Sequence, residues 1–285
     1  MSFKIGVMSD SFGMTSIEEG LNKSAKVGAS GVQIYAVSGD MAPENMTDDR
    51  IKTIKKCLRD NNLVVSALCG DLGGHGFERA VENGWKVEKS KAIVDLALRL
   101  GSNIVTTHIG SIPEDTECET YGVMLKACTE LAAYANSKGT FFAIETGPEP
   151  ADRLKEFLDK IPTNGVAVNL DPANLVMVTG DDPVKAVYTL RDYIVHTHAK
   201  DGVMLKQSDP KEVYNFFAEG GIGDLRLDEY FKEVPLGQGQ VDFDAYLNAL
   251  KDTGYNGFLT IERECGDTPF DDIQLAVNFL KSKNS

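Results

Sequence analysis

Five ionisable side chains stand at or just beyond the ends of short apolar runs, where folding can bring them together. In chain order they are His108, Glu145, Asp171, His198 and Glu262. The intervals from Glu145 to Asp171 and from Asp171 to His198 are nearly equal, and each is long enough for one helix and the next strand. When parallel strands are joined in this way, residues at successive strand ends meet at one rim.

Two glutamates, one aspartate and one histidine form an oxygen-rich ligand set with a single imidazole. Such a set suits Mn²⁺, Mg²⁺, Co²⁺ or Zn²⁺ in a five- or six-coordinate site that is open to substrate. Without a cation, three carboxylates at one rim would repel one another, and some would hold protons. A single strand-end carboxylate could instead form a salt bridge or cap a helix. Because four candidate ligands stand at successive strand ends, we expect these four side chains to bind one divalent metal ion.

Each of the other histidines has two interpretations. His196 lies two residues before His198 on the same face of the strand, so it competes with His198 as the ligand, although its deeper position favours a supporting role. His75, in the loop Gly73–Gly76, is either a substrate contact or an exposed loop histidine. His108 either binds substrate or moves a proton, or it is a hydrogen-bonded core residue. We expect His75 and His108 to contact substrate.

Short apolar runs alternate with longer amphipathic segments along the whole chain. The expected strands are Lys4–Met8, Val32–Ala36, Val64–Cys69, Asn103–His108, Phe141–Glu145, Val166–Leu170, Ile194–His198 and Phe258–Glu262. Strands that are apolar on both faces are typical of a parallel sheet covered by helices. Eight strand–helix units in 285 residues favour the α/β class and a closed (β/α)₈ TIM barrel over a doubly wound sheet.

The interval between the seventh and eighth strands is too long for one helix. Within it, Asp242–Asp252 has a helical pattern, which leaves Lys200–Val241 as an extended loop excursion after strand 7. Long excursions after barrel strands usually belong to the active-site face. No segment rich in Pro, Gly or Ser divides the chain, so we expect one barrel domain over residues 1–285.

The composition excludes several classes of function. The formal net charge of −14 argues against nucleic-acid binding, which needs a basic surface, and against adhesion to anionic membranes. Neither a signal peptide nor an apolar segment of membrane-spanning length is recognisable in the sequence. The five cysteines are an odd number without a Cys-x-x-Cys pair, which favours a reduced, cytoplasmic protein.

Four segments carry a resemblance to a known family. They are Asn169–Asn174 (NLDPAN), His196–Asp201 (HTHAKD), Pro235–Phe243 (PLGQGQVDF) and Gly254–Glu264 (GYNGFLTIERE). With them the sequence resembles the xylose isomerase-like TIM barrel superfamily of sugar phosphate isomerases and epimerases, over nearly the whole chain. Members include ketose 3-epimerases, hydroxypyruvate isomerase, inosose dehydratase and abasic-site endonucleases, so the resemblance leaves the substrate open.

The resemblance implies a metal-dependent isomerase or epimerase of a small polyhydroxy carbonyl compound. By this resemblance, the metal would be held by Glu145, Asp171, His198 and Glu262. In the epimerases of the family, the metal chelates the substrate's carbonyl and adjacent hydroxyl oxygens. Glu145 and Glu262 would then remove and return a proton on opposite faces, through an enediolate. A cation would stabilise that negative charge, and chelation would orient the reacting carbon.

Other members of the superfamily supply the alternatives. The endonuclease branch is rejected, because its trinuclear zinc site needs more histidines than the four present and the negative charge would repel DNA. An inosose-type dehydratase would need an added acid, for which Lys200 or His108 could serve, and hydroxypyruvate isomerase also stays open. We expect Lys200 and Arg263 to bind substrate, with surface salt bridges as the alternative. Two further functions are a sugar-binding barrel without turnover and a hydrolase that uses metal-bound water. Homo-oligomerisation through the outer helices is also possible in this superfamily.

Overall fold

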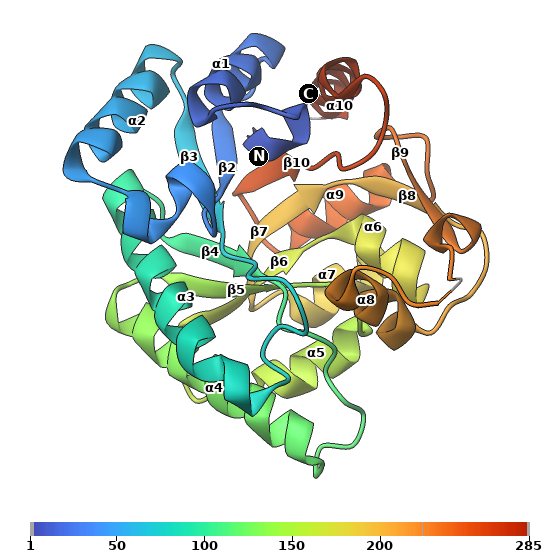
Figure 1. The fold of residues 1–285 in the computed structure, drawn as a ribbon. Coiled ribbons are helices and arrows are strands. Elements are labelled where there is room, and N and C mark those ends of the chain that lie inside the picture. The colour runs from blue at the N-terminus through green and yellow to red at the C-terminus, as the bar shows by residue number, and fades with distance from the viewer. Residues whose placement is uncertain (1–2, 224, 284–285) are drawn as a thin grey trace.

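The protein, in a computed structural model that describes residues 3–223 and 225–283, is built around one closed ring of parallel strands (Figure 1). The ring runs in the order β1-β10-β7-β6-β5-β4-β3-β2. Its strands are β1 Lys4–Met8, β2 Gly31–Tyr35, β3 Val64–Cys69, β4 Ile104–Thr107, β5 Phe141–Glu145, β6 Val166–Leu170, β7 Ile194–Ala199 and β10 Phe258–Ile261. The predicted (β/α)₈ TIM barrel is confirmed.

Helices connect successive strands and cover the outside of the ring. They are α1 Ile17–Val27, α2 Asp48–Asp60, α3 Ala80–Leu100, α4 Glu119–Ser137, α5 Ala151–Leu158, α7 Pro183–Leu190, α9 Phe243–Asp252 and α10 Pro269–Lys283. Short turns of helix follow β1, β2 and β6, namely η1 Ser9–Phe12, η2 Gly39–Met41, η3 Pro43–Asn45, α6 Pro172–Asn174 and η4 Leu175–Thr179. Each long helix buries its apolar stripe against the sheet, as Met124, Cys128 and Leu131 of α4 do.

Local signals explain where several helices begin and end. The Asp182 carboxylate accepts a hydrogen bond from the Val184 N–H (2.8 Å) and so caps the start of α7, whose first residue is a proline. Helix α3 ends at Gly101, whose φ of 96° lies in the left-handed region that glycine adopts without strain. These ends direct the chain back into the next strand.

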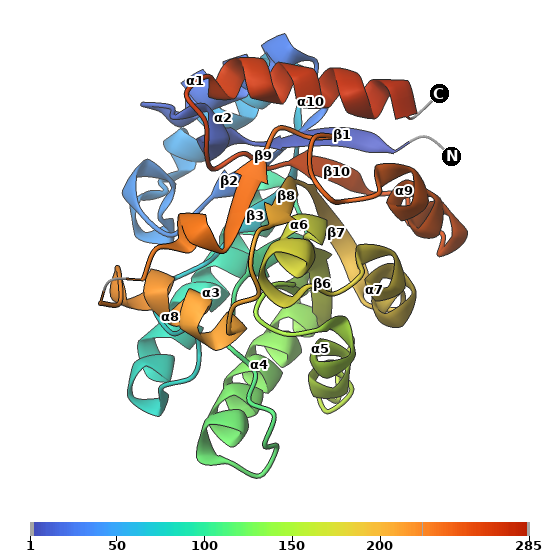
Figure 2. The ribbon, with the colours of Figure 1, turned by 90° about the vertical axis from the view of Figure 1, so that its right-hand side faces the viewer.

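The excursion after strand 7 has a structure of its own. It contains β8 Asp201–Met204, α8 Pro210–Glu219, η5 Leu227–Glu229 and β9 Phe231–Val234, with β8 and β9 paired antiparallel outside the ring (Figure 2). The buried Asp201 carboxylate accepts hydrogen bonds from the backbone N–H groups of Gly237, Gly239 and Val241 (2.9, 2.9 and 3.2 Å), which joins the two ends of the excursion. The predicted extension after strand 7 is therefore confirmed, and it is ordered by its own sheet.

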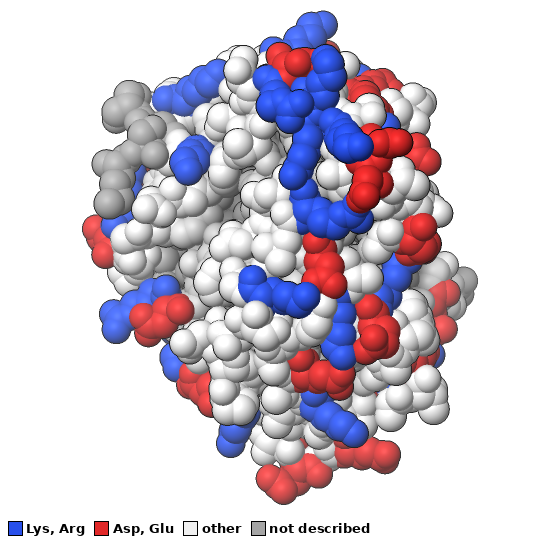
Figure 3. All heavy atoms as spheres, turned by 90° about the vertical axis from the view of Figure 1, so that its left-hand side faces the viewer, with Lys and Arg blue, Asp and Glu red and all other residues white. Residues whose placement is uncertain are grey.

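The surface shows charges of both signs on the face made by α2 and α3. Figure 3 shows lysines and arginines gathered there with carboxylates along their margin. Ion pairs such as Lys56–Asp60 (2.5 Å) and Lys89–Glu44 (2.5 Å) account for part of this mixture. Among the described residues no helix combines the length and apolar character that crossing a membrane requires. All five cysteines are unpaired, and the predicted cytoplasmic location stays a prediction.

Candidate metal centre

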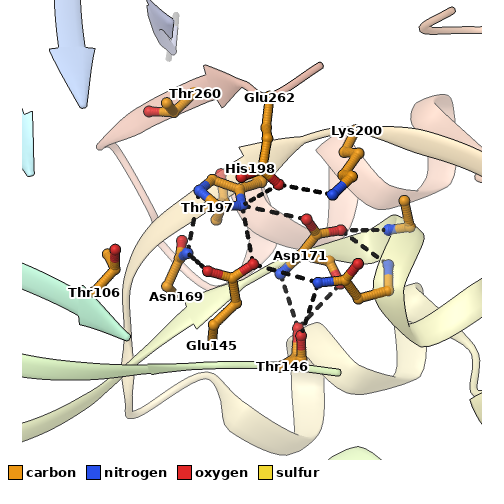
Figure 4. Close-up of polar contacts among 12 residues, drawn as sticks. Thr106, Glu145, Thr146, Asn169, Asp171, Thr197, His198, Lys200, Thr260 and Glu262 are labelled. Atoms are coloured by element: carbon orange, nitrogen blue, oxygen red, sulfur yellow. Dashed lines mark hydrogen bonds and ion pairs between the residues drawn. The ribbon is translucent and has the colours of Figure 1, made fainter. Parts of the chain in front are cut away.

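Four neighbouring strands of the ring direct ionisable side chains to one point at its carboxyl rim. In the order of the ring, β10 leads to Glu262, β7 carries His198, β6 leads to Asp171 and β5 ends in Glu145. All four side chains are buried, and one ligand atom from each lies within 4.8 Å of the others (Figure 4). The equal spacing seen in the sequence thus becomes a compact cluster, because each strand–helix unit returns the chain to the same rim.

His198 stands at the centre of this cluster. Its Nδ1 lies 3.2 Å from Asp171 Oδ2, 3.3 Å from Glu145 Oε1 and 3.3 Å from Glu262 Oε2. Its Nε2 lies 2.8 Å from the side-chain oxygen of Gln33, whose amide nitrogen in turn donates to Thr106 Oγ1 (2.8 Å). Because Gln33 accepts the Nε2 proton, Nδ1 is the nitrogen left to bind a metal.

Backbone and amide groups fix the orientation of two of the carboxylates. Asp171 Oδ1 accepts hydrogen bonds from the N–H groups of Ala173 (2.8 Å) and Asn174 (3.0 Å), which leaves Oδ2 directed at His198. The Glu145 carboxylate accepts from the side-chain amides of Asn169 (3.0 Å) and Asn174 (3.3 Å). Each carboxylate therefore reaches the cluster already oriented.

The donor set fits a divalent ion. Ligand atoms that bind one ion at about 2.0–2.6 Å can lie up to about 5 Å apart, a span that covers the observed cluster. Burial opposes a charge on His198, but Glu262 and Glu145 outweigh it and raise the pKa of the imidazole well above its usual value. Burial likewise opposes the Glu262 carboxylate, whereas His198 and Lys200 hold its pKa well below the usual range. The cluster thus attracts positive charge, as a metal site should.

His196 lies beneath the cluster rather than in it. Its Nδ1 contacts the Asn169 side-chain oxygen (2.8 Å), and its Nε2 accepts from Thr260 Oγ1 (2.9 Å). Burial, with His198 nearby, lowers the pKa of His196 well below its usual value, so its ring is neutral. Of the two competing histidines, the structure brings His198 to the carboxylates and gives His196 a supporting place.

The two cations predicted to bind substrate are held by carboxylates. Lys200 Nζ lies 2.9 Å from Glu262 Oε2 and also contacts Glu264. Arg263 pairs with Glu233 and, through Nε, with Asp272 (2.8 Å). Lys200 therefore touches the candidate metal centre directly, whereas Arg263 stands beside it, and substrate binding by either stays a prediction.

The structure brings His108 to the site and leaves His75 at its margin. His108 Nε2 lies 3.8 Å from Glu145 Oε1, and its Nδ1 lies 3.1 Å from Asp71 Oδ2. Burial opposes its charge, but Glu145 and Asp71 outweigh it and raise the pKa of His108 to about 10. His75 instead pairs with Glu219 of α8 (2.5 Å). The substrate contact of His75 stays a prediction.

A cavity of about 540 Å³ opens beside Glu262. It is lined by Met8, Asp10, Ser11, Gly13, Tyr35, Glu262, Arg263, Glu264, Cys265, Gly266 and Pro269. These residues end or follow β1 and β2 and follow β10, so the cavity lies at the same rim as the cluster. A small polar ligand entering here would meet Glu262.

Several residues that support the cluster are not selected by the sequence pattern used for the ligands. Gln33 interrupts the apolar strand Gly31–Tyr35, and a buried polar residue in such a run is a usable signal. Asn169 and Asn174 lie within the segment that carries the family resemblance, so they could have been assigned with Asp171. Tyr214 of α8 carries no comparable signal, because its position depends on how the excursion folds back.

Glu149, in the loop between β5 and α5, is a buried carboxyl group beside this rim. It is 1% exposed, its Oε1 has no hydrogen-bond partner among the described residues, and Oε2 accepts one long bond from the Ile112 N–H (3.5 Å). Burial, only partly offset by that bond, raises the pKa of Glu149 to about 8. The folded protein therefore holds a proton here that the unfolded chain releases.

We predict that Glu149→Gln stabilises the protein at alkaline pH. Because the folded pKa is raised, the wild-type protein loses stability as the pH rises from about 4.5 to 8, by on the order of 1 kcal/mol per pH unit from this group. Glutamine stays neutral and removes that slope, so the variant should match wild type near pH 5 and melt at a higher temperature near pH 8. Thermal unfolding across this range measures the difference. The surface change Glu130→Gln on α4 is the control, and a Glu149→Gln effect independent of pH would contradict a buried proton.

Comparison with known proteins places these features in a family. Residues 21–283 match the family model described as xylose isomerase-like TIM barrel. An inosose isomerase of Bacillus velezensis is 24% identical over 234 residues, which cover 78% of this chain and 75% of that protein. An inosose dehydratase of Lacticaseibacillus casei is 26% identical over 119 residues, 42% of this chain and 37% of that protein. The crystal structure of a xylose isomerase domain protein from Planctomyces limnophilus superposes with a TM-score of 0.79 at 24% identity, over 99% of this chain and 96% of that one.

Proposed function

Because this chain belongs to the xylose isomerase-like TIM barrel family, we propose that it is an enzyme that binds one divalent metal ion and isomerises or epimerises a small polyhydroxy ketone. The observation that carries the proposal is the buried cluster of Glu145, Asp171, His198 and Glu262 at the carboxyl rim of the barrel. Within the cluster the two glutamates come from β5 and from the end of β10, on either side of the Asp171–His198 pair. That order suits a reaction with two proton-transfer groups.

The chemistry needs a group on each side of the reacting carbon. A bound divalent ion would hold two adjacent substrate oxygens and offset the negative charge that develops on them when a neighbouring carbon loses its proton. Glu262, next to the cavity, removes or returns a proton on one face, and Glu145 does so on the other. Asn169 and Asn174 hold Glu145, whereas Lys200 holds Glu262. Fixed orientation of both carboxylates lowers the cost of reaching the reactive arrangement.

The charges around the cavity favour an uncharged substrate. Asp10, Glu262 and Glu264 supply three carboxylates to its lining, and Arg263 is the only cation among the described residues that line it. Arg263 is already engaged by Glu233 and Asp272. A phosphate or carboxylate on the substrate would therefore find no free cationic side chain in the lining of this cavity. We propose a neutral polyol ketone rather than a sugar phosphate.

A dehydratase of the inosose type is the second candidate. Such an enzyme would use the same carboxylates and an added acid that protonates the departing hydroxyl group. The buried Lys200, 2.9 Å from Glu262, is placed to supply that proton, which is the observation that keeps this candidate. His108, beside Glu145, is the alternative acid. The non-enzymatic candidate is a barrel that binds a sugar without converting it.

Two linked measurements test the proposal. Metal content is determined by mass spectrometry, and the metal-loaded protein is incubated in deuterium oxide with neutral ketoses, ketose phosphates, hydroxypyruvate and inososes. We expect about one divalent ion per chain and deuterium uptake into one neutral ketone. Loss of water from an inosose would instead favour the dehydratase.

The remaining outcomes are equally informative. Uptake confined to phosphorylated ketoses would contradict the neutral substrate and leave the metal-dependent chemistry intact. A bound ion without exchange or water loss in any compound would favour the binding protein. Failure to bind a divalent ion after reloading would mean that the four ligands are wrongly assigned.

A further inference from the structure

Helix α8 carries one aromatic side chain back onto the rim of the barrel. Tyr214 packs against the ring of His108, with 5.6 Å between the ring centroids. Five residues later, Glu219 pairs with His75 (2.5 Å) and Arg79 (3.1 Å) on the loop before α3. The excursion is therefore attached to the barrel on the side of β3 and β4, away from the cavity beside Glu262.

Gly147 provides the space into which the Tyr214 hydroxyl fits. A Cβ atom at position 147 would lie 1.7 Å from Tyr214 Oη, closer than any two non-bonded atoms can approach. Gly147 does not have the positive φ that would itself require glycine. Glycine at this position is therefore explained by the approach of the tyrosine, two residues after the candidate ligand Glu145.

Among the residues that the structure describes, the Tyr214 side chain has its ring contact with His108, and its hydroxyl takes part in no hydrogen bond with another of them. Its surroundings are carboxylates: burial, followed by the charges of Glu145, Glu149 and Asp171, raises the pKa of Tyr214 well above its usual value. The hydroxyl therefore keeps its proton and is available as a donor. A donor without a partner, placed beside a site for a polyhydroxy compound, is in position to serve a ligand.

We propose that Tyr214 donates a hydrogen bond to a hydroxyl group of the substrate on the Glu145 side of the site, and so determines which polyol ketones are accepted. This inference rests on the function proposed above. The substrate would then lie between the cavity beside Glu262 and the ring of Tyr214. The excursion after β7 thereby becomes part of the binding site, because it supplies a recognition group from outside the eight barrel strands.

The test removes the hydroxyl and keeps the ring. Tyr214→Phe is compared with wild type and with Tyr188→Phe, the same change on the outer helix α7, where the exposed tyrosine bonds Asp252 (3.0 Å). With the neutral ketone that exchanges fastest, we expect kcat/KM to fall about tenfold in Tyr214→Phe, the effect of one lost hydrogen bond. Tyr188→Phe should be unchanged, and both variants should bind one metal ion.

Deoxy analogues of the same ketone separate recognition from a structural role. Each lacks one hydroxyl group, and the analogue without the group that Tyr214 contacts should be used equally well by wild type and Tyr214→Phe. Gly147→Ala provides a second measurement, since its methyl group displaces the tyrosine. It should lower kcat/KM in the wild-type background and have little further effect in Tyr214→Ala.

The outcomes distinguish this inference from the proposed function. Equal kcat/KM in wild type and Tyr214→Phe, or a tenfold loss that persists with every deoxy analogue, would overturn the role of Tyr214 and leave the function standing. A wild-type protein that exchanges no compound in the panel would overturn the function, and with it the need for a substrate donor.

Discussion

Interconversion of the two epimeric or isomeric substrates is expected to fall by about 10²- to 10⁴-fold in both Glu145→Gln and Glu262→Gln. Each substitution replaces a carboxylate by an amide of nearly the same shape, which cannot accept a proton from carbon. An oxygen stays available for the metal in either variant, so metal binding should weaken rather than disappear. The measurement is solvent-deuterium uptake and product formation, alongside metal content.

The two variants should differ in which proton they still exchange. If the two glutamates act on opposite faces, Glu145→Gln retains exchange in one of a pair of epimers and Glu262→Gln retains it in the other, while neither converts one into the other. Glu130→Gln, on the outer surface of α4, is the matched control and should behave as wild type. Near-normal interconversion in both cluster variants would exclude the mechanism with two bases.

The barrel was predictable because its strands follow from local pattern. Strands β1, β3, β5 and β6 begin and end where the apolar runs do. Strand β4 ends before His108 and β10 ends before Glu262, because these polar side chains follow the last paired residue at the rim. A strand that is buried on both faces appears in the sequence as a continuous apolar run, so these strands can be found without knowing their register or packing.

For the excursion after β7, the sequence predicts an unusually long segment but not the elements that it forms. Its strands β8 and β9 pair with each other across an intervening helix, and short strands of this kind have no clear apolar period. The position of Tyr214 depends on two remote partners, His108 and Gly147, which no local pattern links to α8. Such contacts are set by how the folded excursion meets the barrel.

The candidate ligands were predictable, and their supporting groups less so. Equal spacing and strand-end positions are enough to select Glu145, Asp171 and His198, since parallel strands return to one rim. The partner of His198 comes from β2, across the barrel; a polar Gln33 in an apolar strand is a signal that the residue matters, but no local pattern links it to His198. Likewise, the sequence does not show which carboxylates pair with Lys200 and Arg263, because only the folded rim brings them near.

Asp171→Asn is expected to lower the affinity for the divalent ion by more than about 100-fold, beyond the 10- to 100-fold typical of a lost supporting partner. Asp171 Oδ2 faces His198 Nδ1 at 3.2 Å, whereas Oδ1 accepts the N–H groups of Ala173 and Asn174. Asparagine keeps an oxygen for these two bonds but places an uncharged amide toward the metal. Calorimetric titration with Mn²⁺ and Co²⁺ measures the loss directly, without a substrate.

A second variant separates the metal ligand from the helix cap. Asp171→Ala removes both functions, so it should bind the ion as poorly as Asp171→Asn and also lose about 1 kcal/mol of stability, the usual effect of a lost cap. Asp182→Asn is the control, because Asp182 caps α7 through Val184 and stands outside the cluster. Unchanged metal affinity in Asp171→Asn would remove this residue from the ligand set. A loss of affinity in Asp171→Asn with unaltered thermal unfolding of the metal-free protein would instead show that Oδ2 serves the ion and Oδ1 serves the fold.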